Sequence, residues 1–194
     1  MKIIFNPFLR TAGWPALIYG LAGLIITAWL SAIYDVHLDN ILSMHINGEV
    51  SLSTAFMESF TNWLTLILVF GLAAWILNRM GFRLLDLLGI MALVRMPFLV
   101  LPPVNGLFQI GEIDQKLKAG IVEGSNEIML TAGETVRFAG YIITVLLFII
   151  LSATWMYHGF RLLSNTRGLR ANITFIIALV AATAISEITV TIIQ

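Results

Sequence analysis

The chain has 194 residues, and its 11 basic and 11 acidic side chains give a formal net charge of zero. Charged residues make up 11% of the chain and hydrophobic residues 59%, whereas about 25% of a typical soluble domain is charged. This composition excludes a soluble globular domain and a disordered chain. Because the chain has no cysteine, a disulfide scaffold and a cysteine-based metal site are excluded as well. An integral membrane protein is the class that remains.

Five segments are apolar and long enough, or nearly so, to cross a bilayer as helices, which takes about 20 residues each. They are residues 14–34, 59–78, 87–104, 138–157 and 173–193. The runs are continuously apolar, whereas the strands of a membrane barrel would alternate apolar and polar residues. The first run is longer than the ~7–15 apolar residues of a signal peptide, so we expect an uncleaved span. The sequence therefore predicts one all-α membrane domain, a bundle of five transmembrane helices over residues 1–194.

The third segment is the weakest of the five predictions. It is short, it contains Arg95, and Pro97, Pro102 and Pro103 interrupt it. A re-entrant segment that enters and leaves on one side is the alternative interpretation there.

The loops between the spans separate the charges. With five spans, seven basic residues lie on the side of the N-terminus and three on the opposite side: Lys2, Arg10, Arg79, Arg83, Arg161, Arg167 and Arg170 against Lys116, Lys118 and Arg137. The positive-inside rule then predicts a cytoplasmic N-terminus and a C-terminus outside. Nine acidic residues lie on the outer side and one, Asp86, on the inner side, which is consistent with this orientation.

Apolar side chains recur at helical spacing in both outer links. In the first link they suggest one or two helical turns and are Leu38, Ile41 and Leu42, with His45 in the same register. In the second link they are Phe108, Ile110, Ile113, Leu117 and Ile121. The second set predicts an amphipathic helix that lies on the outer membrane surface or folds over the bundle.

Arg95 and Glu187 are the two charged residues inside predicted spans. An arginine at the centre of a span costs about 2.5–3.5 kcal/mol on insertion scales, so it must face the bundle, water or a partner. Counted from the ends of their spans, the two residues lie within about one helical turn of the same depth. We predict an intramembrane pair, either a structural contact between spans three and five, which we favour, or part of a transport path.

Pro97 follows Arg95 by two residues. It lacks a backbone N–H, so the carbonyl of Leu93 loses its helical partner and the third span is expected to kink there. Some transporters build binding sites at such breaks, but a proline inside a span more often produces only a kink.

Asp35, His37, Asp39 and His45 in the first outer link are of the types that bind Zn²⁺ or Mn²⁺. Their spacing matches no established metal motif. We therefore favour a solvated loop at the membrane interface and treat His37, Asp39 and His45 as a weak metal candidate.

Small residues recur every four positions in the first and last spans. They are Ala12, just before the first span, with Ala16 and Gly20 inside it, and Thr174, Ala178, Ala182 and Ser186 in the last. This spacing lets helix backbones approach closely. Packing within the chain explains it, and a homodimer is left open.

Motifs for nucleotide cofactors and serine nucleophiles are absent from the sequence, so we expect no enzyme activity and no cofactor. Basic residues are too few and too scattered for nucleic-acid binding. Those of the last inner link, Arg161, Arg167 and Arg170, are expected to anchor helix ends to anionic lipid.

Three stretches resemble the YIP family of Ypt/Rab-interacting five-span membrane proteins, in its compact prokaryotic branch. They are NPFLRTAGWPALIYGL at the start of the chain, GFRLLDLLGIMALVRMPFLVLP at residues 81–102 and YHGFRLLSNTRGLRANITFIIAL at residues 157–179. The resemblance, together with the five spans, covers nearly the whole chain.

The resemblance implies a five-helix bundle without catalytic activity, whose eukaryotic relatives act in vesicle trafficking. The Asp-Leu-Tyr-Gly-Pro signature and the long N-terminal region of the eukaryotic branch are missing, so Rab-type GTPase binding is not carried over. We expect a non-enzymatic protein of the bacterial inner membrane that organises or binds other membrane components. The alternative is a small transporter or channel that uses Arg95 and Glu187.

Overall fold

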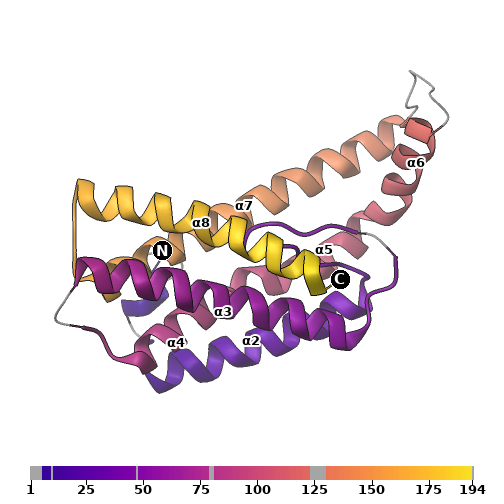
Figure 1. The fold of residues 1–194 in the computed structure, drawn as a ribbon. Helices are drawn as coiled ribbons and strands as arrows, with labels where there is room; N and C mark the ends of the chain where they lie inside the picture. Colours follow the sequence, from indigo (N-terminus) through magenta and orange to yellow (C-terminus); the bar gives the residue numbers. More distant parts are fainter. Residues whose placement is uncertain (1–5, 10, 47, 79–80, 123–129, 194) are drawn as a thin grey trace.

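The computed structural model describes residues 6–9, 11–46, 48–78, 81–122 and 130–193. In these ranges the chain is helical, apart from its links and a single pair of bridged residues. The elements follow one another as η1 (Pro7–Leu9), α2 (Trp14–Ile33), α3 (Leu52–Leu77), α4 (Leu84–Leu93), η2 (Met96–Val100), α5 (Leu101–Phe108), α6 (Ile110–Val122), α7 (Ala132–Ser164) and α8 (Leu169–Ile193). Figure 1 shows them as a bundle in which α7 diverges from the other helices.

The five predicted spans are confirmed. Within the described ranges, five helical segments are long and apolar enough to cross a membrane, namely α2, α3, residues 84–108, α7 and α8. They are 20 to 33 residues long, and at about 1.5 Å per residue even the shortest matches a hydrocarbon core of about 30 Å. The side of the membrane on which each terminus lies stays a prediction.

Two spans begin six or seven residues earlier than the sequence predicts, at helix starts that polar side chains cap. α3 begins at Leu52, where the Ser51 hydroxyl accepts a hydrogen bond from the Thr54 N–H at 3.1 Å. α7 begins at Ala132, after a capping box formed by Thr131 and Glu134. Such caps satisfy backbone N–H groups that the first helical turn leaves free.

The third span is an interrupted helix that crosses the whole bundle. α4 ends at Leu93, the chain continues as the 3-10 turn η2, and α5 follows directly. Pro97 lies in η2, as expected for a residue that cannot donate the helical backbone hydrogen bond. With 61% of its most apolar stretch buried, this span is the central helix of the fold.

The stripes of small residues pack within the chain. On α2, Ala16 and Gly20 are buried where α2 meets α4. On α8, the stripe of Ala178, Ala182 and Ser186 is buried where α8 meets α3. This arrangement is the close backbone approach that small residues permit in membranes.

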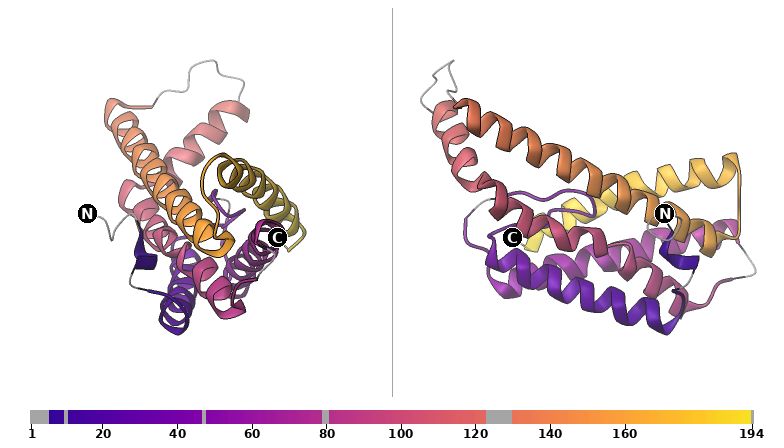
Figure 2. Two further views of the ribbon diagram at one scale, coloured as in Figure 1. Left: turned by 90° about the vertical axis from the view of Figure 1, so that its left-hand side faces the viewer. Right: turned by 180° about the vertical axis from the view of Figure 1, so that it is seen from behind.

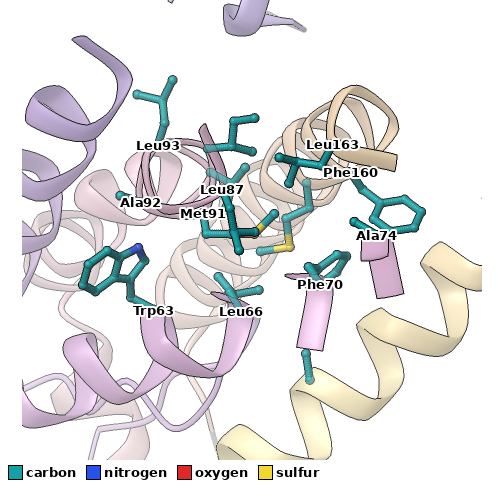
Figure 3. Close-up of a cluster of buried hydrophobic side chains, with 14 of the residues drawn as sticks. Trp63, Leu66, Phe70, Ala74, Leu87, Met91, Ala92, Leu93, Phe160 and Leu163 are labelled. Carbon is teal, nitrogen blue, oxygen red and sulfur yellow. The ribbon is translucent and has the colours of Figure 1, made fainter. Parts of the chain in front are cut away.

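Large side chains fill the space between α3, α4, α7 and α8. Figure 3 shows Trp63, Leu66 and Phe70 of α3 facing Met91 of α4, with Phe160 of α7 nearby. The ring of Phe70 lies 5.8 Å from the rings of Phe160 and Phe175, which are themselves 6.0 Å apart. These edge-on and tilted contacts are favourable geometries for aromatic pairs.

The second outer link contains the helix that the apolar spacing predicts, and this helix extends from α5 along the start of α7 rather than over the bundle. Its helix is α6, with Ile110 and Ile113 buried and Lys116 exposed. Lys116 forms an ion pair with Glu134 and so ties α6 to the start of α7. Both views of Figure 2 show α6 and α7 running to the same extremity of the molecule.

Candidate functional site

The first outer link does not lie in solvent but folds into the bundle. Val36, Leu38 and Ile41 are completely buried, and Asn40 is nearly so. In the end-on view of Figure 2 this segment lies between the helices. We call residues 36–46 the inserted loop. The expectation of a solvated interfacial loop is therefore wrong, because apolar side chains draw the segment into the core.

The expected helical turns in this link are also wrong. His37 and His45 face each other as an isolated antiparallel bridge, with His37 N–H donating to the His45 carbonyl at 2.9 Å and His45 N–H to the His37 carbonyl at 3.1 Å. Leu38 and Ile41 thus point into the core from an irregular loop. Their spacing matches that of a helix, but the segment is too short for periodicity to distinguish a helix from an irregular loop.

Buried side chains from two spans hold the backbone of the inserted loop. The Leu38 N–H donates to Oε2 of Glu58 at 2.8 Å, and the Leu38 carbonyl accepts from Nδ2 of Asn62 at 2.9 Å. Nη1 of Arg95 donates to the carbonyl of Ile41 at 2.6 Å. Irregular backbone inside a membrane is tolerated only where protein or trapped water satisfies its polar groups. Glu58, Asn62 and Arg95 perform that task here.

Asn40 connects the inserted loop to α8. Its Oδ1 accepts hydrogen bonds from the N–H groups of Leu42 and Ser43 at 2.8 and 2.9 Å, which closes a tight turn. Its Nδ2 lies 3.5 Å from Oε2 of Glu187. One residue earlier on α8, the hydroxyl of Ser186 donates to Oδ1 of Asn62. The loop is therefore bonded to α3, to the third span and to α8.

The structure does not bring Arg95 and Glu187 together. Among the described residues, no ion pair within 4.0 Å joins them. Arg95 is buried, with its guanidinium 4.4 Å from the centre of the Phe98 ring, while Glu187 is exposed on α8. Each contacts the inserted loop, Arg95 at Ile41 and Glu187 at Asn40. The loop lies between the two charges that the sequence predicted to pair.

The outer histidines form two stacked imidazole–carboxylate contacts. Nδ1 of His37 lies 2.6 Å from Oε1 of Glu58, and Nδ1 of His45 contacts Oδ1 of Asp39. The two imidazole rings are 5.0 Å apart and nearly parallel, at 13°. Within the described parts of the chain, no three His, Asp or Glu side chains are placed to hold a metal ion. The carboxylates thus fix the ring orientations of a structural bridge.

Sequence reasoning missed the two residues on which the loop depends most. Glu58 is completely buried, as is Asn62, although the sequence places Glu58 among the outer charges. The two are four residues apart and therefore share one face of α3. With the helix extended back to Leu52, a carboxylate and an amide lie on one face of an apolar helix. That pattern was the sequence signal for a buried polar site.

Comparison of the chain with protein-family models, curated proteins and solved structures gives no match. The resemblance to the YIP family therefore stays a prediction from the sequence.

We expect Arg95→Met to loosen the inserted loop while changing the free energy of unfolding by no more than about 1–2 kcal/mol. The substitution removes the hydrogen bond to Ile41, worth about 1.5–3 kcal/mol for a charged donor, but it also removes an insertion cost of about 2.5–3.5 kcal/mol. Hydrogen exchange of residues 36–46, beside equilibrium unfolding in micelles, measures the two effects separately.

Arg83→Met is the matched control, since Arg83 is exposed at the start of α4. It should leave exchange in the inserted loop unchanged. Equal exchange in Arg95→Met and the parent protein would show that Arg95 does not hold the loop.

Proposed function

We propose that the protein is a non-enzymatic, YIP-like integral protein of the bacterial inner membrane that binds other membrane proteins, and that α7 is the helix that contacts them. The observation that carries this proposal is the burial of α7. Only 6% of its most apolar stretch is buried, against 39%, 44%, 61% and 22% for the other spans in chain order.

The exposed side chains of α7 gather on one face. Ile143, Leu147 and Ile150 are each about 60% exposed, and their spacing of four and three residues places them along one side of the helix. Association of helices in a membrane comes from side-chain packing rather than from the removal of apolar surface from water. A helix that packs so little against its own chain keeps this face available to a transmembrane helix of a partner.

The buried polar side chains favour a rigid bundle core rather than one that moves during function. Glu58, Asn62 and Arg95 are buried and bonded to the backbone of the inserted loop. Such a network holds the loop in one place between α3, α8 and the third span. In this proposal α2, α3 and the third span form a fixed platform that carries α7.

Photocrosslinking tests this function. A photoreactive phenylalanine analogue placed at Ile143, Leu147 or Ile150 in cells should give one discrete protein adduct, at a yield several-fold above that at Ile18 and Ile25. These control positions on α2 are 60% and 54% exposed, so they meet lipid to a similar degree.

The adduct should also follow the helical period of α7, because only one face of the helix contacts the partner. Lipid adducts alone at all five positions would overturn the proposal. So would protein adducts of equal yield on α2 and α7, since these would reflect random collisions in the membrane.

A further inference from the structure

A pocket of about 360 Å³ lies at the end of the bundle that carries η1. The C-terminal turn of α7, the link to α8 and η1 form its walls. Its lining includes Phe8, His158, Arg161, Asn165, Thr166 and Arg167. The pocket is remote from the inserted loop, and the functions considered so far do not use it.

The charge of this pocket is positive and uncompensated. Among the residues that the structure describes, Arg161 and Arg167 line it, and no acidic side chain does. In the described part of the chain, no carboxylate lies within 4.0 Å of either guanidinium. Two arginines without a carboxylate in one concave site favour an anionic ligand, because guanidinium groups bind phosphate oxygens through paired N–H donors.

The side chain of Arg161 and the backbone on either side of Arg167 have restricted positions. The guanidinium of Arg161 lies 5.5 Å from the centre of the Tyr157 ring, and the Tyr157 hydroxyl is in turn 2.6 Å from Oδ1 of Asn172 on α8. Arg167 belongs to a link between Asn165 and Gly168, both of which adopt left-handed backbone conformations with φ of 48° and 80°. The pocket therefore presents the donors of Arg161 before a ligand arrives, which lowers the entropy cost of binding.

The position of the pocket matches the level of lipid headgroups. α7 has 33 residues, which at about 1.5 Å per residue exceeds the ~30 Å hydrocarbon core. Arg161 is three residues from the end of α7 and lies beyond that core if the helix is centred. Leu162, also in the lining, is 54% exposed, so an apolar surface adjoins the basic one.

We propose that this pocket binds a phosphate group through Arg161 and Arg167. The phosphate can belong to the headgroup of an anionic phospholipid, whose acyl chains would lie against the exposed apolar side of α7, or it can be free in solution. Both ligands share the chemistry that the pocket recognises. The experiment distinguishes them.

The test uses the full chain in nanodiscs of phosphatidylcholine, with Leu169→Cys carrying an environment-sensitive fluorophore. Labelling is unique because the chain has no cysteine. Dioctanoyl phosphatidylglycerol and inorganic phosphate are titrated in separate arms. We expect saturable binding that Arg161→Gln/Arg167→Gln weakens at least tenfold. Saturation by the lipid alone identifies a headgroup site, and saturation by inorganic phosphate identifies a site for free phosphate.

The matched control is Arg83→Gln/Arg170→Gln, which removes the same charge from the same end of the bundle but not from the pocket lining. It should change the affinity by less than twofold. Equal weakening in both double variants would overturn the proposal in favour of diffuse surface charge. A lack of saturable binding in both arms would also overturn it. Arg167→Gln alone, at an exposed position, gives the same test if the double variant does not fold.

Discussion

Glu58→Leu is expected to lower the free energy of unfolding by about 3–5 kcal/mol, the range for removing one member of a buried polar pair. Glu58 is completely buried, and its two oxygens contact different groups, the N–H of Leu38 at 2.8 Å and Nδ1 of His37 at 2.6 Å. Leucine restores neither acceptor. Equilibrium unfolding in mixed micelles measures the loss, and hydrogen exchange at Leu38 locates it.

Glu58→Gln is the control for this experiment. Glutamine has nearly the shape of glutamate and keeps one carbonyl oxygen for the Leu38 N–H, so we expect a loss of only about 1–2 kcal/mol. A loss in Glu58→Leu no greater than in Glu58→Gln would mean that the carboxylate does not hold the inserted loop. Protection of Leu38 that survives in both variants would lead to the same conclusion.

The sequence predicted the five spans because their signal is strong. The second and last spans, for example, are long apolar runs. A run of this kind can cross a bilayer in few structures other than a helix. The break at Pro97 and the amphipathic helix that became α6 were also readable, since proline chemistry and helical spacing act locally. The paired small residues on α2 and α8 showed which faces pack closely.

The inserted loop was not predictable in the same way. Whether Leu38 and Ile41 lie in the bundle or at its surface depends on partners distant in the chain, such as Asn62 and Arg95. Counting residues from the span ends predicted that Arg95 and Glu187 lie at similar depths in the membrane. Similar depth does not show what lies between the two helices. The segment that separates them is itself a loop, and hydropathy does not distinguish an inserted loop from an interfacial one.

The buried polar groups share one physical role. A loop that enters an apolar bundle brings backbone N–H and carbonyl groups that water no longer reaches, and each would cost several kcal/mol if left unpaired. Glu58 supplies an acceptor, Asn62 supplies a donor, and Arg95 supplies a charged donor. The free-energy cost of placing these side chains in a membrane is offset by the hydrogen bonds that they make to the loop backbone. This balance explains why charged residues occur in these spans.

The contact between α2 and α4 leads to the second large expected effect. Gly20→Ala should lower the free energy of unfolding by about 3 kcal/mol, at the upper end of the cost of over-packing a core. A Cβ atom at Gly20 would lie 2.5 Å from Cβ of Ala92 and 2.6 Å from the backbone nitrogen of Leu93. Backbone atoms cannot move aside as a flexible side chain can, so the two helices must separate. Equilibrium unfolding in micelles measures the change.

Substitutions at two other glycines should have smaller effects on the free energy of unfolding. At Gly23 a new Cβ would meet Sδ of Met96 at 2.1 Å, and the flexible thioether side chain can turn away, so Gly23→Ala should cost clearly less than Gly20→Ala. At Gly111 on α6 a Cβ would meet nothing within 4 Å, so Gly111→Ala should be neutral or stabilising by about 0.5–1 kcal/mol. The order Gly20, Gly23, Gly111 follows from what each Cβ would strike. Equal losses at Gly20 and Gly23 would contradict a rigid backbone contact between α2 and the third span.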